Sequence, residues 1–282
     1  MAQKVAESTP DLSGFRHAAG TQLQIVPRLT YLLRQRSITL ASLAKNVNST
    51  AIALGAVWYV AFLLSTTCHE AAHSLAAKLG GDLTAFEGGQ VTLNPIPHIR
   101  RSPFGMVVVP LLSYALGGWM IGWANAPYNP DWARRHPHRA AWMALAGPAA
   151  NFTLMLLAAA AIRTGVALGY FAAPDSISGF AALTIPAQGG APNFATSALS
   201  VLFILNLLLG TFNLLPVPPL DGYSAIMLLM PESLAVRYMD FFRSGQFMFI
   251  GLLLAWKAYD YLFGFVFNIG LHLLYPGANY HG

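Results

Sequence analysis

A His-Glu-x-x-His pattern at residues 69–73 closes a long apolar run, and this combination limits what the chain can fold into more than any other feature. The run extends from Ala51 to Thr67, as expected for a helix that enters a membrane. On a helix, His69 and His73 lie on one face and can bind the same metal ion. Burying them with Glu70 in hydrocarbon is costly, so we expect these residues to have a function.

Zinc is the metal that this pattern favours. Imidazole nitrogen is a good zinc ligand, and a catalytic zinc site has three protein ligands and an open position for water. Glu70 lies about 100° around the helix from His69, where it can act on that water as a general base. The alternative is a pair of helix-end histidines that are hydrogen-bonded by backbone or lipid headgroups.

Composition indicates an integral membrane protein. Apolar residues make up 55% of the 282 residues and charged residues only 10%, against about 25% charged in soluble domains. Mean hydropathy is +0.51. The net charge of +5 comes from scattered basic residues without a basic, aromatic-rich face, so nucleic acid is not an expected partner. Partners are expected to be the lipid bilayer and membrane proteins. The single cysteine, Cys68, excludes an internal disulfide.

The apolar pattern predicts an all-α, polytopic helical bundle. Long apolar helices are expected at residues 51–79, 140–163, 196–215 and 246–272. Residues 104–123 are also apolar but are broken by Pro110 and by Gly117-Gly118, so we expect a re-entrant or peripheral segment there.

The remaining segments are more polar. Residues 22–47 suit an amphipathic helix at the membrane surface, and 231–244 a short amphipathic piece. Residues 82–98 suggest a small β-hairpin after the first long helix. The chain is therefore divided into an N-terminal polar and amphipathic region, an intramembrane core, and an amphipathic piece with a last apolar helix, at residues 1–50, 51–230 and 231–282.

Asp221 is the best candidate for a third metal ligand. Most of the other acids lie in polar loops, whereas Asp221 follows an apolar helix and three prolines and precedes Gly222. Irregular backbone at membrane depth is tolerated where it lines a cavity, so Asp221 can point into a wet intramembrane pocket. The alternative is an ordinary aspartate at the end of a helix, among the headgroups.

Membrane topology tests this choice. His73 and Asp221 lie at the C-terminal ends of their helices, so the two helices must end on the same side of the bilayer. This requires only one of the segments 104–123 and 140–163 to cross. The same arrangement puts the basic residues of 100–101 and 134–139 on the zinc side, which the positive-inside rule assigns to the cytoplasm.

In several motifs the chain resembles the site-2 protease family of intramembrane zinc metalloproteases. The motifs that carry the resemblance occur in the family's order over about residues 52–230. They are His69-Glu70-x-x-His73, Leu93-Asn94-Pro95-x-x-His98, Gly122-Trp123-Ala124, Ala146-Gly147-Pro148-x-x-Asn151, and Asn213-Leu-Leu-Pro216 through Pro219-Leu220-Asp221-Gly222.

The resemblance implies a core of three transmembrane helices with Zn²⁺ inside the membrane near its cytoplasmic face. It implies Asp221 as third ligand, Glu70 as catalytic base, and Asn213 as a residue that holds the substrate or polarises its carbonyl. The compact subgroup without a PDZ domain is most similar, and a bacterial inner membrane is the expected location. The chain departs from the family where relatives often carry Asp-Pro, at Arg100-Arg101, and after Asp-Gly, at residues 223–225.

The function expected from these features is zinc-dependent hydrolysis of peptide bonds in or near transmembrane segments of membrane proteins. Residues 91–95 would then pair with an unwound substrate strand or serve as a loop brace. His98 would support the site or lie on the surface, and the surface is favoured. A zinc-binding membrane scaffold or sensor is the main alternative. A transporter is disfavoured because the chain has no internal repeat.

Overall fold

The computed structural model describes residues 49–242 and 246–277. Its elements in chain order are α3 (Ser49–Leu79), α4 (Thr84–Glu87), α5 (Pro95–Arg101), the π-helix η2 (Phe104–Val108), α6 (Val109–Gly117), α7 (Pro130–Arg135), α8 (Pro137–Ala167), β1 (Phe171–Ala172), β2 (Ile185–Pro186), α9 (Phe194–Asn213), α10 (Asp221–Ala225), the 3₁₀-helix η3 (Ile226–Leu229), α11 (Glu232–Phe241) and α12 (Gln246–Leu274). The predicted all-α class is confirmed. The surface helix expected at residues 22–47 lies outside the described residues.

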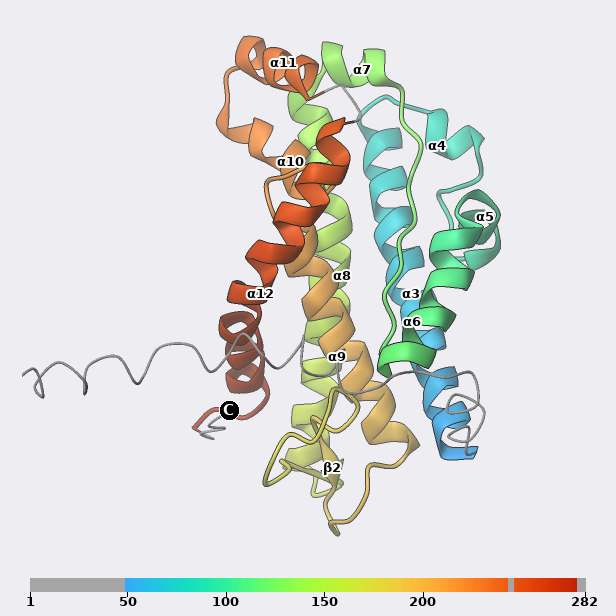
Figure 1. Ribbon diagram of the computed structural model, residues 1–282, viewed down its shortest axis with the longest axis vertical. Coiled ribbons are helices and arrows are strands. Elements are labelled where there is room, and N and C mark those ends of the chain that lie inside the picture. The colour runs from blue at the N-terminus through green and yellow to red at the C-terminus, as the bar shows by residue number, and fades with distance from the viewer. Residues whose placement is uncertain (1–48, 243–245, 278–282) are drawn as a thin grey trace, which may run out of the picture. The chain divides into compact units, whose positions relative to one another are not determined.

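Four of the described helices are long and apolar enough to cross a membrane: α3, α8, α9 and α12. In their most apolar windows, 39% to 50% of the residues of α3, α8 and α9 are buried inside the protein, but only 11% of those of α12. The first three helices therefore form the core, and α12 leaves most of its surface to lipid. Figure 1 shows α12 along one flank of this core.

The three core helices enclose one apolar cluster. Trp58 and Phe62 of α3, Ile162 of α8, and Phe203 and Ile204 of α9 are all at most 1% exposed and belong to it. Helices pressed together in lipid gain little from the hydrophobic effect, so close packing and buried polar contacts must hold them. The polar contacts gather higher along α3, where the candidate site lies.

The segment predicted to be re-entrant turns back before crossing. η2 and α6 form a continuous apolar helix, Phe104–Gly117, that is too short for a span. It ends at Gly118, whose φ of +76° is the left-handed conformation typical of a glycine cap. The Tyr114 hydroxyl donates to the carbonyl of Ala51 at 2.7 Å, close to the start of α3. The prediction is confirmed.

After this turn the chain returns in extended form over residues 118–129, beside α3 (Figure 1). The return limb touches the descending limb directly, since a Cβ on Gly105 or on Gly122 would overlap backbone of the other limb. The amide of Trp123 donates to the carbonyl of Gly105 at 3.1 Å. Glycine is therefore needed at both positions for close backbone approach.

The β-hairpin predicted at residues 82–98 is wrong in its position. That stretch contains α4 and α5 with bends between them. Asn94 accepts a hydrogen bond from the amide of Ile96 at 3.0 Å and caps α5, and Pro95 occupies the first helical turn. An Asn-Pro pair is thus a helix start here rather than an extended turn. The small antiparallel sheet lies between α8 and α9, where β1 pairs with β2.

Asp82 joins the end of α3 to the start of α7. Its carboxylate accepts hydrogen bonds from the amide and hydroxyl of Thr84, at 3.0 and 2.6 Å, and from the amide of Asn129 at 2.8 Å. Burial opposes the charge, but these three donors outweigh it and hold the pKa of Asp82 below its ordinary value. Asp82 therefore fixes the upper end of the extended segment against α3.

We expect Asp82→Asn to destabilise the protein by about 1–3 kcal/mol at pH 7, because at least one buried donor loses its acceptor. A lowered pKa means that this stabilisation is present above the unfolded pKa, near 3.8, and is lost as the pH falls through the folded value. Thermal unfolding in detergent at pH 7 and below pH 4 measures the difference. The exposed Asp175→Asn is the control, and an equal effect of both variants at pH 7 would contradict the account.

Candidate metal centre

α3 and α8 face each other with two stripes of residues spaced four apart. Such stripes lie on one face of a helix and form the ridges through which helices pack. The stripes run in opposite directions along the two helices, which are antiparallel (Figure 1). The stripe on α3 consists of Ser65, His69 and His73, and the stripe on α8 consists of Met143, Gly147 and Asn151.

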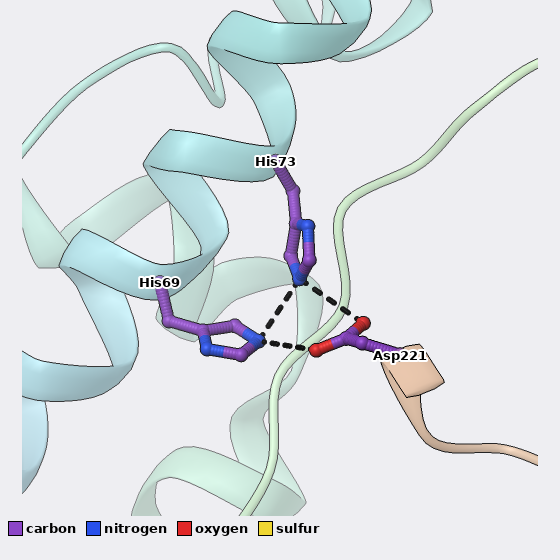
Figure 2. A group of neighbouring side chains, drawn as sticks. All are labelled: His69, His73 and Asp221. Atoms are coloured by element: carbon purple, nitrogen blue, oxygen red, sulfur yellow. Dashed lines mark hydrogen bonds and ion pairs between the residues drawn. The ribbon is translucent and has the colours of Figure 1, made fainter. Parts of the chain in front are cut away.

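The predicted meeting of His69, His73 and Asp221 is present. The Nε2 atoms of the two histidines lie 2.9 Å apart. The Asp221 carboxylate lies 3.1 Å from Nε2 of His69 and 3.2 Å from Nε2 of His73. Figure 2 shows all three side chains pointing toward one another, the histidines from α3 and the aspartate from the start of α10. They are the group in the described residues whose ligand atoms can hold a metal ion.

The turn between α9 and α10 delivers the aspartate. α9 ends at Asn213, and a proline-rich connection leads back toward α3 before α10 begins at Asp221. A Cβ on Gly222 would overlap the carbonyl of Leu214, so the turn closes only with glycine there. The Asp-Gly pair thus places the carboxylate and allows the tight return.

Each histidine is oriented through its other ring nitrogen. Nδ1 of His73 lies 2.7 Å from the carbonyl oxygen of Met143. A carbonyl can only accept, so Nδ1 of His73 carries a proton, and the neutral ring then has its lone pair on Nε2. Nδ1 of His69 lies 2.6 Å from the side-chain Oδ1 of Asn151. An amide can face either way, so the tautomer of His69 depends on what orients Asn151.

A chain of hydrogen bonds fixes that orientation. The Nδ2 of Asn206 donates to the carbonyl of Leu202, and its Oδ1 accepts from Nδ2 of Asn151, both at 2.8 Å. Because the Leu202 carbonyl can only accept, Asn206 cannot be reversed, and neither can Asn151. Oδ1 of Asn151 therefore faces His69 and accepts its Nδ1 proton. In their neutral form both histidines thus have the Nε2 lone pair facing Asp221, which is the form that binds a metal.

This arrangement can hold a cation. Two nitrogen lone pairs and a carboxylate repel one another at about 3 Å in a buried site, and a proton or a metal ion between them offsets this repulsion. Ligands at zinc distances around a tetrahedral ion are about 3.4 Å apart, close to the 2.9 to 3.2 Å measured here. Gly147 leaves room for an ion, since a Cβ there would overlap the Nε2 atoms of both histidines. The donor set fits Zn²⁺, with nitrogen and oxygen ligands.

Glu70 lies beside the metal ligands on α3. It is 4% exposed, and its Oε2 is buried without a hydrogen-bond partner. An unpaired buried carboxylate oxygen is costly, which indicates that water or a substrate group completes it. This environment suits the predicted role as a base.

Three asparagines lie near or support the metal centre, and the sequence analysis treated them differently. Asn213 ends α9, and its amide donates to the carbonyl of Leu209 on the same helix at 3.0 Å. Asn151, which the sequence analysis named only as part of a motif, hydrogen-bonds His69 of α3. Asn206 was not anticipated. The signal for it is a lone amide inside an otherwise apolar stretch of α9.

The sequence analysis favoured a surface position for His98, and this prediction is wrong. It is 1% exposed, and its Nε2 lies 3.0 Å from the carbonyl of Thr92. His98 therefore braces the loop before α5. The loop position misled the prediction, because the neighbouring turn folds back over the ring.

Comparison with known proteins agrees with this site. The model of the family described as "Peptidase family M50" matches residues 57–255. This range includes all three candidate ligands and most of the described residues. The chain belongs to peptidase family M50, the site-2 protease family.

Relatives of this chain in two bacteria are named as putative zinc metalloproteases. The chain is 29% identical to "Putative zinc metalloprotease YwhC" of Bacillus subtilis over 78% of this chain and 84% of that protein. It is 30% identical to "Putative zinc metalloprotease Rip2" of Mycobacterium tuberculosis over 58% of this chain and 54% of that protein. No solved structure matches the chain. With its four membrane-length helices, the chain is an integral, multi-pass membrane protein of a zinc metalloprotease family.

We expect Gly147→Ala to remove bound zinc, because its methyl group would occupy the space between the two Nε2 atoms. Metal analysis of the purified protein should show about a tenfold lower zinc content than in the wild type. Gly264→Ala is the matched control, since a Cβ at that helical glycine meets nothing within 4 Å. Full zinc content in both variants would show that the ion does not lie against Gly147.

Proposed function

We propose that this protein is an intramembrane zinc metalloendopeptidase that hydrolyses peptide bonds in or near the transmembrane segments of membrane proteins. One observation carries the proposal: two imidazole lone pairs and a carboxylate converge beside a buried, unpaired Glu70. This set lies on α3 and α10, and α3 is long and apolar enough to cross a membrane. A site at membrane depth is accessible to substrates within the bilayer.

Each candidate residue has a role in this reaction. His69, His73 and Asp221 would hold Zn²⁺, which when bound lowers the pKa of water and polarises a carbonyl. Glu70 accepts a proton from the attacking water and returns it to the leaving amine. Asn151 and Asn206 keep the histidines in the required tautomer. Asn213, at the end of α9, stays a proposed substrate-binding residue.

The extended segment 118–129 is the best place for an unwound substrate strand. It is anchored at Gly122, against Phe62 of α3, and at Asn129, which hydrogen-bonds Asp82 just after α3. These anchors bracket His69 and His73 along α3. Between them, residues 124–128 make no backbone–backbone hydrogen bond within the described ranges. Free backbone groups can pair with an added strand. Residues 91–95, the segment first proposed for this role, are bent.

A location in the bacterial inner membrane, with the metal near the cytoplasmic face, is part of the proposal. Arg134 and Arg135 end α7, and Arg139, in the first turn of α8, donates to the carbonyl of Gly80 just past α3. The basic residues thus gather beyond the end of α3 that carries the histidines. The positive-inside rule favours the cytoplasm for that side.

We expect Asp221→Asn to lose zinc and cleavage together. A neutral amide replaces the carboxylate that balances the ion, so zinc content should fall to about a tenth or less of the wild-type value. Metal analysis and circular dichroism on the same sample separate loss of the ion from loss of the fold. Tight, stoichiometric zinc in this variant would exclude Asp221 as a ligand.

Glu70→Gln should retain zinc and lose proteolysis. Removing a general base lowers the rate by about 10²–10⁴-fold, whereas the three metal ligands are untouched. The measurement is cleavage of a transmembrane reporter substrate in proteoliposomes, with zinc content determined in parallel. If the wild type binds zinc but cleaves none of a library of transmembrane segments, the zinc-binding scaffold becomes the better account.

A further inference from the structure

A polar cavity outside the metal centre lies between the loop after α4 and helix α5. Its volume is about 400 Å³, within the range of small-molecule sites. Six residues line it: Gly88, Gly89, Gln90, Pro97, Arg100 and Arg101. No acidic residue is among them. The arginine pair is also one of the places where this sequence departs from the motif of its family.

The two arginines make this cavity an anion site. Nε of Arg101 donates to Oδ1 of Asn125 at 2.8 Å, which orients the guanidinium, and its other nitrogens make no further hydrogen bond in the described residues. Arg100 makes no ion pair or hydrogen bond within the same ranges and is exposed. A guanidinium matches the oxygens of a phosphate in geometry and charge. Both side chains are thus available to one phosphate.

Gln90, which also lines the cavity, has a buried oxygen that lacks a hydrogen-bond donor. It is 4% exposed, and its Nε2 donates to the carbonyl of Pro97 at 3.2 Å. That bond fixes which terminal atom of the Gln90 amide is nitrogen, and the other atom, Oε1, is buried without a hydrogen-bond partner. A buried acceptor is normally paired, so a ligand that carries a hydroxyl or ammonium group would complete it. The cavity therefore fits an anion with a hydrogen-bond donor nearby.

The surroundings of the cavity are apolar. Leu93, Ile96 and Phe104 flank its lining residues along the chain and are 46% to 69% exposed, whereas the Phe86 ring carries the ammonium of Lys78 at 3.5 Å. This segment connects the end of α3 to the re-entrant helix Phe104–Gly117, so it lies beside the bilayer. A free phosphate would gain nothing from these side chains, whereas the acyl chains of a lipid would cover them.

We propose that this cavity binds the headgroup of an anionic glycerophospholipid that carries a hydroxyl donor, as phosphatidylglycerol does. The phosphate lies against Arg100 and Arg101, and a headgroup hydroxyl donates to Oε1 of Gln90. The acyl chains lie over the exposed apolar residues Leu93 and Phe104. The proposal does not rest on the proposed proteolysis.

Native mass spectrometry of the full chain, purified in detergent and titrated with phosphatidylglycerol, tests the site. Arg100→Gln with Arg101→Gln should weaken binding about tenfold or more. The control is Arg135→Gln with Arg237→Gln, which removes two exposed arginines and the same charge. Equal weakening in both double variants would show a general charge effect and overturn the proposal.

Two arms on the wild type identify the ligand without relying on a variant. Phosphatidylmethanol has the same charge as phosphatidylglycerol but lacks the hydroxyl donors, and it should bind several-fold more weakly. Equal binding of the two lipids would remove the role of Gln90. Inorganic phosphate at about 10 mM should not displace the lipid, because it lacks the apolar contacts. Displacement would assign the cavity to free phosphate instead.

Discussion

The hydrogen bonds behind the two histidines determine the chemistry of this protein. The Met143 carbonyl and the Asn151 amide take the Nδ1 protons, so both Nε2 lone pairs point at one carboxylate. A positive charge among the three groups offsets their repulsion, and when that charge is a metal ion they form its ligand set. The orientation of Asn151 depends in turn on Asn206 of α9. The metal centre therefore requires α3, α8 and α9 in register, although α3 supplies both imidazoles.

The same contacts hold the core together. In lipid, apolar side chains gain little by leaving the bilayer for the protein interior, so buried amide and hydroxyl contacts carry more of the packing. Ser65, Asn151 and Asn206 form such a link among the three helices, with Nδ2 of Asn206 also donating to Oγ of Ser65 at 2.8 Å. Small residues support it, since Gly147 allows α8 to approach the histidines. Residues that orient the ligands are thus also residues that join the helices.

Much of this could be predicted from the sequence, because the relevant signals were local or topological. The spacing of His69 and His73 is a property of one helix, and the apolar runs predicted all four long helices within a few residues of their ends. Asp221 was selected by comparing the few acidic residues of the chain, and the requirement that two helix ends lie on the same side tested that choice. Asn206 could not be found in this way, because its role depends on a contact with Asn151 from another helix. The misplaced hairpin reflects competing local signals, since Asn94-Pro95 begins a helix as readily as it bends a loop.

The arrangement also explains why a short helix followed by an extended return is useful beside the site. A transmembrane substrate has its amides satisfied within its own helix, and unwinding it in lipid leaves backbone groups without partners. Residues 124–128 offer unpaired backbone groups along the part of α3 that carries the histidines. In the proposed function, pairing with these groups offsets part of the cost of unwinding a substrate. Because Nε of Arg101 donates to Asn125 within this segment, the cavity at Arg100 and Arg101 and the proposed substrate segment share one anchoring contact.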